Sequence, residues 1–147
     1  FEGQAAMWLE GIAKKEETGE YPVRFSDGET LVADSRALIL EVAKDMLSGT
    51  SAAVVAAHFH NSMARLVADG IGILVKKTGI RTVGLSGGCF QNKLFTERTV
   101  ALIDGAELKV LLHAAVPPND GGIALGQVVS ALARFWKRGK IGGTFFV

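Results

Sequence analysis

The stretch from residue 82 to residue 126 constrains the fold more than any other part of this sequence. Two short runs at 82–85 and 108–112 are rich in Val and Leu and have the length of buried strands. A polar loop containing glycine follows each run, and each loop leads into a helical pattern. Strands that alternate with helices predict an α/β fold with a parallel sheet and right-handed crossovers.

The two loops have the sequences SGG at 86–88 and PPNDGG at 117–122. Ligands of parallel sheets bind beyond the carboxyl ends of the strands. Because both loops follow a predicted strand, we expect them to lie at the same edge of the sheet. That edge is the candidate binding site of the chain.

The first loop has the composition of an anion site. Gly87 and Gly88 lack a Cβ atom, so the backbone can approach a ligand closely. We expect a helix to begin near Phe90 and to direct its first N–H groups into that space, with Asn92 about one turn into the helix. A simple tight turn stays an alternative, because the loop matches neither the Gly-Lys-Ser/Thr phosphate loop nor G-x-G-x-x-G.

The second loop carries a carboxylate beside two glycines. Pro117 and Pro118 fix φ and remove two donors, which stiffens the approach to Asp120. Asp120 is expected either to cap a helix from about Gly121 to Trp136 or to serve a metal or phosphate site. One Asp cannot complete a metal site, so further ligands would come from elsewhere. The expected packing face of that helix consists of Ile123, Leu125, Val128, Val129, Leu132 and Phe135.

Four segments resemble one known family. They are SGGCFQN at 86–92, VPPNDGGIALGQ at 116–127, FEGQAAM at 1–7 and HFHN at 58–61. Together they resemble the C-terminal part of HypF-type hydrogenase maturation carbamoyltransferases, the second lobe of the Kae1-like domain. The resemblance implies one lobe of an actin-like ATPase fold, shared with acetate kinase, with a mixed or parallel sheet flanked by helices.

The resemblance also implies roles for individual residues. Asp120 would be a metal ligand, and two further ligands would be histidines of an H-x-x-x-H pair. The three histidines of this chain lack that spacing, which is explained if the first lobe of the domain is absent. The positions expected to bind the nucleotide or the substrate are Ser86, Gly87, Gly88, Asn92, Glu2 and Gly121.

The activity implied by the resemblance is carbamoyl transfer during synthesis of the cyanide ligands of nickel–iron hydrogenases. A separate domain makes carbamoyl adenylate from carbamoyl phosphate and ATP. The Kae1-like domain passes the carbamoyl group to the C-terminal cysteine of a HypE-like acceptor protein, with a divalent metal (Zn, Fe or Mg). No residue of this chain is expected to act as a catalytic base or nucleophile, Cys89 included, and the isolated chain is expected to be inactive.

Other functions stay open at this point. A transferase of the same fold could use tRNA or a small-molecule hydroxyl as acceptor, although a net charge of +1 gives no electrostatic case for nucleic acid. A kinase or ATPase of the actin-like fold could use Asp120 on magnesium. A domain that binds nucleotide without catalysis is the remaining alternative.

Composition sets the broad class. The 147 residues are enough for one domain, and the start at Phe1 suggests a piece of a longer protein. Hydrophobic residues make up 48%, as expected if one face meets a missing lobe. A single cysteine fits a reducing cytoplasm, and no apolar stretch is long enough to suggest a membrane span.

The first half of the chain is expected to frame the lobe. Helices are predicted at 3–17, 34–47 and from Thr50 or Ser51 to about residue 77, with a hairpin at Asp27-Gly28. His58 and His60 are two residues apart and should point to different sides of their helix. The glycine-rich tail at 138–147 is compatible with a flexible end or with a segment folded back onto the lobe.

Overall fold

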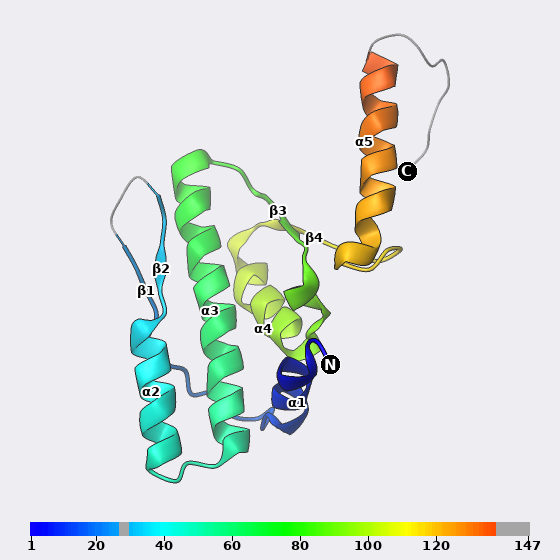
Figure 1. Ribbon diagram of the computed structural model, residues 1–147. Helices are drawn as coiled ribbons and strands as arrows, with labels where there is room; N and C mark the ends of the chain where they lie inside the picture. Colours follow the sequence, from blue (N-terminus) through cyan, green and yellow to red (C-terminus); the bar gives the residue numbers. More distant parts are fainter. Residues whose placement is uncertain (27–29, 138–147) are drawn as a thin grey trace.

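The computed structural model describes residues 1–26 and 30–137 (Figure 1). It is a mixed α/β structure of helices with two small two-stranded sheets, one parallel and one antiparallel. The elements in chain order are α1 (Gln4–Ile12), β1 (Arg24–Phe25), β2 (Ala33–Asp34), α2 (Arg36–Leu47), α3 (Ala52–Thr78), β3 (Thr82–Leu85), α4 (Lys93–Ile103), β4 (Lys109–Leu112) and α5 (Ile123–Lys137), with short 3₁₀ helices η1 (Gly88–Gln91), η2 (Asp104–Ala106) and η3 (Asp120–Gly122).

The long helix α3 is the centre of the structure, and α1, α2 and α4 lie around it (Figure 1). Ala56 and Ala57 of α3 are fully buried and pack with Ala13 and Leu94. Small side chains at this position let α1 and α4 approach α3 closely. The core therefore sits between these three helices, beneath the sheet edge that carries the two loops.

The ends of α3 confirm the predicted signals. Ser51 is the N-cap residue, and its side chain accepts a hydrogen bond from the N–H of Val54 at 3.4 Å. Gly79 ends the helix with φ 71°, a left-handed conformation that favours glycine. Residues 52–78 thus form one uninterrupted helix, in spite of two internal glycines.

The two predicted strands of the central stretch pair in parallel, as expected. Strand β3 covers the predicted residues, and β4 begins at Lys109, one residue later than predicted. The register places Leu85 opposite Leu112, so both strands end level. A second, antiparallel pair joins β1 and β2, which confirms a hairpin, and its predicted Asp27-Gly28 turn lies outside the described residues.

Two helices are shorter than predicted, in both cases because a hydrogen bond outside the helix forms where the helix was expected to continue. Helix α1 ends at Ile12, because Ala13 is extended and the N–H of Lys14 donates to the carbonyl oxygen of Ala53 at 3.0 Å. Helix α2 begins at Arg36, because Asp34 pairs in β2 and its carboxylate accepts the N–H of Arg36 at 3.0 Å.

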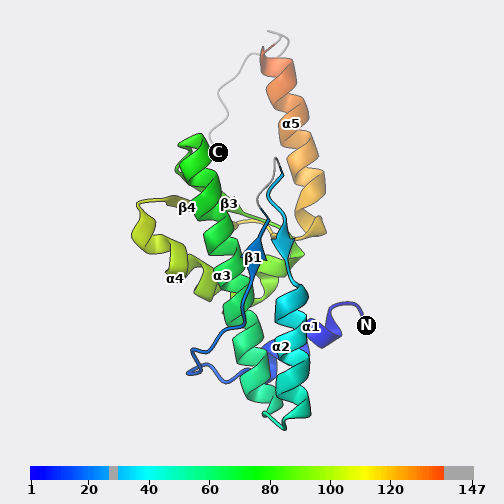
Figure 2. The same cartoon turned by 90° about the vertical axis from the view of Figure 1, so that its left-hand side faces the viewer.

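Helix α5 extends away from the other helices in both views (Figures 1 and 2). The predicted packing face of this helix does not pack within the described chain: Ile123 is 54% exposed, Val128 55% and Phe135 47%. No surface among residues 1–26 and 30–137 covers this apolar face. The tail at 138–147 lies outside the described residues. No helix in the described part is long and apolar enough to cross a membrane.

Candidate functional site

The loops after β3 and β4 meet at one edge of the sheet, as predicted. The N–H of Gly87 in the first loop donates to the carbonyl oxygen of Pro118 in the second loop at 2.7 Å. Because both strands end level, the hydrogen bond joins the two loops directly beyond the carboxyl ends of the strands. The candidate site is therefore one continuous backbone surface built from two distant parts of the chain.

Gly87 has a conformation that only glycine adopts readily. Its φ of 110° and ψ of 160° place it in a region closed to residues with a Cβ atom. The chain then forms the 3₁₀ helix η1, and α4 begins only at Lys93, later than the predicted start near Phe90. The N–H of Phe90 donates to the carbonyl oxygen of Gly87 at 3.1 Å, which closes the turn of η1 on Gly87.

Asn119, rather than Asp120, caps the second loop, which corrects the predicted N-cap. The Oδ1 atom of Asn119 accepts the N–H of Gly121 at 3.1 Å, and η3 begins at Asp120. A Cβ atom at Gly122 would lie 3.0 Å from the carbonyl oxygen of Pro117, so the proline and the glycine pack against each other. The helix predicted from Gly121 accordingly begins two residues later, at Ile123.

The carboxylate of Asp120 is exposed and has no hydrogen-bond or ion-pair partner among residues 1–26 and 30–137. Within the same residues, no three His, Cys, Asp or Glu side chains lie close enough to hold a metal ion. Asp120 can therefore supply one carboxylate ligand, which binds through one or both oxygens. The described residues do not fit a complete metal site by themselves, and the other donors would have to come from outside them.

Asn92 is the N-cap of α4 instead of lying one turn inside a helix. Its Oδ1 atom accepts the N–H of Phe95 at 2.8 Å, and its Nδ2 atom lies 2.9 Å from Nε2 of buried His60. Nδ1 of His60 lies 2.7 Å from the carbonyl oxygen of Ala56, which can only accept. His60 is thus fixed as the neutral tautomer that donates from Nδ1 and accepts from Asn92.

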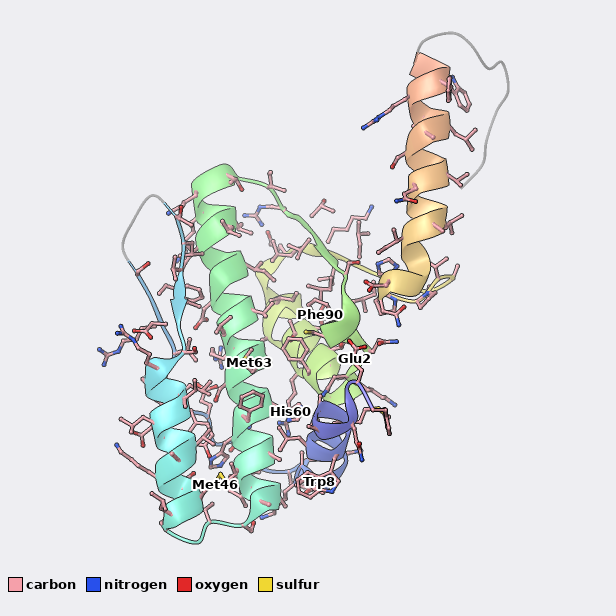
Figure 3. The ribbon with its side chains drawn as sticks, in the orientation of Figure 1. Glu2, Trp8, Met46, His60, Met63 and Phe90 are labelled. Atoms are coloured by element: carbon pink, nitrogen blue, oxygen red, sulfur yellow. The ribbon has the colours of Figure 1, made fainter. Side chains whose placement is uncertain are left out.

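An apolar pocket of about 270 Å³ opens next to Asn92 between α1, α3 and the loop after β3. Figure 3 shows two of the labelled residues in this region, His60 and Met63, on α3. The thiol of Cys89 also faces the pocket, which places it beside the first loop. The pocket is lined by Ala6, Leu9, Phe59, His60, Met63, Cys89, Asn92 and Phe95.

His58 points to the other side of α3, as predicted. Its ring lies between two carboxylates, with Nε2 3.4 Å from Oε1 of Glu17 and Nδ1 3.8 Å from Oδ2 of Asp45. The buried Nε2 atom makes no well-formed hydrogen bond within the described residues. The contact with His58 is the main reason that the pKa of Glu17 lies below its usual value. Burial and a 2.8 Å hydrogen bond to Asp45 raise the pKa of Tyr21.

His113 is a site residue that the sequence analysis did not select. Its Nε2 atom lies 2.9 Å from Oγ of Ser86, and both side chains are exposed. The parallel register offered the signal: Ser86 and His113 each come directly after the paired residues Leu85 and Leu112. Two residues that follow level strand ends are neighbours at the sheet edge.

Glu2 is the predicted site residue that no hydrogen bond links to the two loops. It is exposed, precedes α1, and has no hydrogen bond or ion pair with any described residue (Figure 3). The structure thus brings together Ser86, Gly87, Gly88, Asp120 and Gly121 at the sheet edge. Asn92 lies just behind the first loop.

Comparisons with known proteins agree with this geometry. Residues 1–127 match the family model described as the second subdomain of the Kae1-like domain of carbamoyltransferases. The carbamoyltransferase HypF of Synechocystis sp. is 35% identical over 134 residues, which cover 90% of this chain and 17% of that protein. HypF2 of Cupriavidus necator is 33% identical, with 91% of this chain and 20% of that protein covered.

Two solved structures have the same fold. A crystal structure of full-length HypF in its phosphate- and nucleotide-bound form superimposes with a TM-score of 0.87 at 34% identity, covering 92% of this chain and 18% of that one. A crystal structure of HypF from T. kodakarensis has a TM-score of 0.73 at 26% identity, with 97% and 18% covered. The chain thus spans about a fifth of the length of these relatives, and it belongs to the family formed by the second subdomain of the Kae1-like domain of HypF carbamoyltransferases.

Proposed function

We propose that this chain is the second lobe of a carbamoyltransferase that takes the carbamoyl group from carbamoyl adenylate. The acceptor is the C-terminal cysteine of a HypE-like protein, in the cytoplasm, and the product serves synthesis of the cyanide ligands of nickel–iron hydrogenase. The lobe has an actin-like ATPase fold and closes on the nucleotide together with a first lobe. An adenylate-forming domain makes carbamoyl adenylate from carbamoyl phosphate and ATP.

The hydrogen bond between Gly87 and Pro118 is the observation that carries this proposal. It fixes two glycine-containing loops at the carboxyl ends of parallel strands, where nucleotides bind in α/β proteins. The related full-length HypF was crystallised with phosphate and nucleotide. A site of the same architecture in this chain is suited to the phosphate end of an adenylate.

Each loop has its own task in the proposed site. Gly87 and Gly88 let the adenylate phosphate approach the backbone, and the hydroxyl of Ser86 offers a side-chain hydrogen bond beside them. Gly121 keeps the second loop free of a side chain where the two loops meet. Asn92 lines the apolar pocket behind the first loop, which has the size and lining to receive the nucleoside. Glu2 approaches the nucleotide from the start of the chain.

Asp120 contributes one ligand to a divalent metal (Zn, Fe or Mg), and the first lobe contributes the others. The exposed, unpartnered carboxylate is compatible with this assignment, because no described residue competes for it. A metal bound there would polarise oxygen atoms of the carbamoyl or phosphate group. The described residues of this chain hold the ligand and exclude water on their own side of the cleft.

The proposed reaction is an acyl transfer to sulfur. The cysteine thiolate of the acceptor forms a bond to the carbamoyl carbon, and the bond between that carbon and the phosphate oxygen breaks. AMP leaves with the bonding electron pair, and the thiol proton has been released before the attack. Backbone N–H groups near Gly88 would stabilise negative charge that develops on oxygen in the transition state.

The experiment uses the full-length protein that contains this chain, with labelled carbamoyl phosphate and ATP. A peptide ending in cysteine, tRNA and a hydroxylated small molecule are offered in parallel. Label on the cysteine peptide, lost in Asp120→Asn together with bound metal, supports the proposal. Label on tRNA or on the small molecule would assign the chemistry to a different acceptor. ATP hydrolysis without any labelled acceptor would indicate an ATPase or kinase, and nucleotide binding without turnover a non-catalytic module.

The chain alone should not catalyse the transfer. Half of the proposed cleft and the remaining metal ligands lie outside it, so its affinity for nucleotide should also be lower than that of the full-length protein. Transfer by residues 1–147 alone at the full-length rate would contradict this part of the proposal.

A further inference from the structure

We propose that His113 is a positioning residue of the anion site: its ring sets the direction of the Ser86 hydroxyl, and thereby its ability to donate to a bound phosphate. This inference rests on the proposed function, because it assumes that the loop after β3 receives the phosphate end of a nucleotide. It adds a sixth member to the group at the sheet edge, and it assigns that member a task that acts through Ser86.

The geometry of the pair is determined by the sheet. Leu85 and Leu112 are the last paired residues of β3 and β4, and Ser86 and His113 are the next residue on each strand. Their side chains meet with 2.9 Å between Nε2 and Oγ. Both are exposed, so the hydroxyl is not fixed by burial. The imidazole is its one side-chain partner among the described residues.

A serine hydroxyl has a single hydrogen, so it cannot donate to His113 and to an anion at once. If Nε2 accepts, the hydroxyl hydrogen points at the ring and only oxygen lone pairs face the ligand, which repels a phosphate. If Nε2 carries a hydrogen and donates to Oγ, the hydroxyl hydrogen is free to donate to the phosphate. A bound anion therefore selects the forms of His113 that are protonated at Nε2.

Of the two neutral tautomers of His113, only the one with hydrogen on Nε2 can donate to Oγ of Ser86. The imidazolium carries hydrogen on both nitrogens, so it can always donate from Nε2. No described residue forms an ion pair with His113. The titratable groups on the adjoining loops are the Asp120 carboxylate and the Cys89 thiol, and Arg81 and Glu107, before the two strands, pair with each other at 3.3 Å.

The test measures binding of AMP to the full-length protein by calorimetry, with carbamoyl transfer measured in parallel. Ser86→Ala should weaken AMP binding about tenfold, the usual effect of one hydrogen bond to a charged group, and His113→Ala should weaken it less, because the hydroxyl is still present but is no longer directed. The double variant should bind no more weakly than Ser86→Ala alone, because His113 acts through that hydroxyl. His113→Gln should restore most of the affinity, since its amide N–H can donate to Oγ.

The pH dependence separates positioning from a structural role. The ratio of wild-type to His113→Gln affinity cancels the titration of AMP itself, and it should depend on pH only through the imidazole. Thermal unfolding of each variant checks the fold. If His113→Ala unfolds, His113→Gln and its pH profile carry the test.

Three outcomes would overturn the inference: wild-type affinity in His113→Ala, an additive loss in the double variant, or a ratio that does not change with pH. If the wild type transfers carbamoyl but shows any of these, only the role of His113 fails. If the wild type neither binds AMP nor transfers carbamoyl to any acceptor, the proposed function fails and takes this inference with it.

Discussion

The helical body consists of α1, α3 and α4, and the sheet edge consists of the loops after β3 and β4. These two regions differ in whether their polar groups have hydrogen-bond partners within the described residues. In the body, His60 has hydrogen-bond partners on both ring nitrogens, and Thr99 donates to the carbonyl oxygen of Phe95 at 2.8 Å. At the edge, the Asp120 carboxylate is exposed and has no partner among the described residues. Ser86 is held there by a single exposed contact.

The difference is the one expected between a region that stabilises the fold and a proposed binding site. A buried polar group without a partner costs free energy, so the body tolerates few of them. Exposed groups with spare hydrogen-bonding capacity cost little while water covers them, and they are free to bind a ligand. At the edge, the positive φ of Gly87 determines the shape of the first loop.

Asn92→Ala should give the largest loss of stability. The change removes the cap of α4 and leaves the buried Nε2 of His60 without a donor, which together should lower the free energy of unfolding by about 2 to 3 kcal/mol. The matched control is Asn119→Ala, which removes an exposed cap of the same chemistry and should cost less than about 1 kcal/mol. Urea unfolding of both variants measures the difference.

Equal losses for the two asparagine variants would show that the body does not depend on the bond between Asn92 and His60. A second variant, His60→Gln, keeps an amide that can accept from Asn92 and should recover part of the stability lost in His60→Ala.

Gly87→Ala should come next in size. The conformation of Gly87, with φ 110° and ψ 160°, is strained for any residue with a Cβ atom, and the cost should be about 1 to 2 kcal/mol. Gly88 has no positive φ, and a Cβ atom there would meet nothing within 4 Å, so Gly88→Ala should leave the unfolding midpoint nearly unchanged. If both variants are equally stable, the first loop has no backbone constraint at Gly87.

Local signals predicted most of the element types. The apolar runs gave β3 and β4, the Ser51 cap and Gly79 gave the ends of α3, and the parallel pairing followed from strand–helix alternation. These features are local or follow from general rules of connection, so they can be read without contacts. The meeting of the two loops followed from the same rules.

What could not be predicted depended on contacts between distant residues or on small geometric choices. The end of α1 required the bond from Lys14 to Ala53, which no local pattern indicates. Asn119 and Asp120 are adjacent, and the side chain of either can accept an N–H. The sequence therefore does not determine which of them is the cap, and the structure shows that it is Asn119. His113 became visible only through the strand register.

Glu17→Gln should have a smaller effect that depends on pH. The pKa of Glu17 lies below its usual 4.5, mainly through the contact with His58 and next through the backbone of Gly19. A carboxyl whose pKa is lowered on folding stabilises the protein above its unfolded pKa, and that contribution is lost as the pH falls through the folded pKa. Lowering the pH from about 5 to about 3 should therefore decrease the free energy of unfolding of the wild type more than that of Glu17→Gln.

Glu16→Gln is the control, because Glu16 is the neighbouring exposed carboxyl. A wild type and a Glu17→Gln variant with parallel stability curves below pH 4.5 would mean that Glu17 makes no net contribution to folding through His58.

Substitutions in helix α5 should have the smallest effect on the stability of this chain. Their larger effect should be on the full-length protein. Val128 and Val129 are 55% and 49% exposed, so Val128→Asp and Val129→Asp should change the unfolding free energy of this chain by less than about 0.5 kcal/mol. If the first lobe of the proposed domain covers this apolar face, the same changes in the full-length protein should lower carbamoyl transfer and increase cleavage by protease.

Ser130→Asp, an exposed polar position on the same helix, controls for the added charge. Destabilisation of the isolated chain by Val128→Asp would show that α5 packs within this chain after all. Full transfer activity in the full-length variants would show that the first lobe binds elsewhere. The sheet edge would then have to form its site without support from α5, through the bond from Gly87 to Pro118 and the contact between Ser86 and His113.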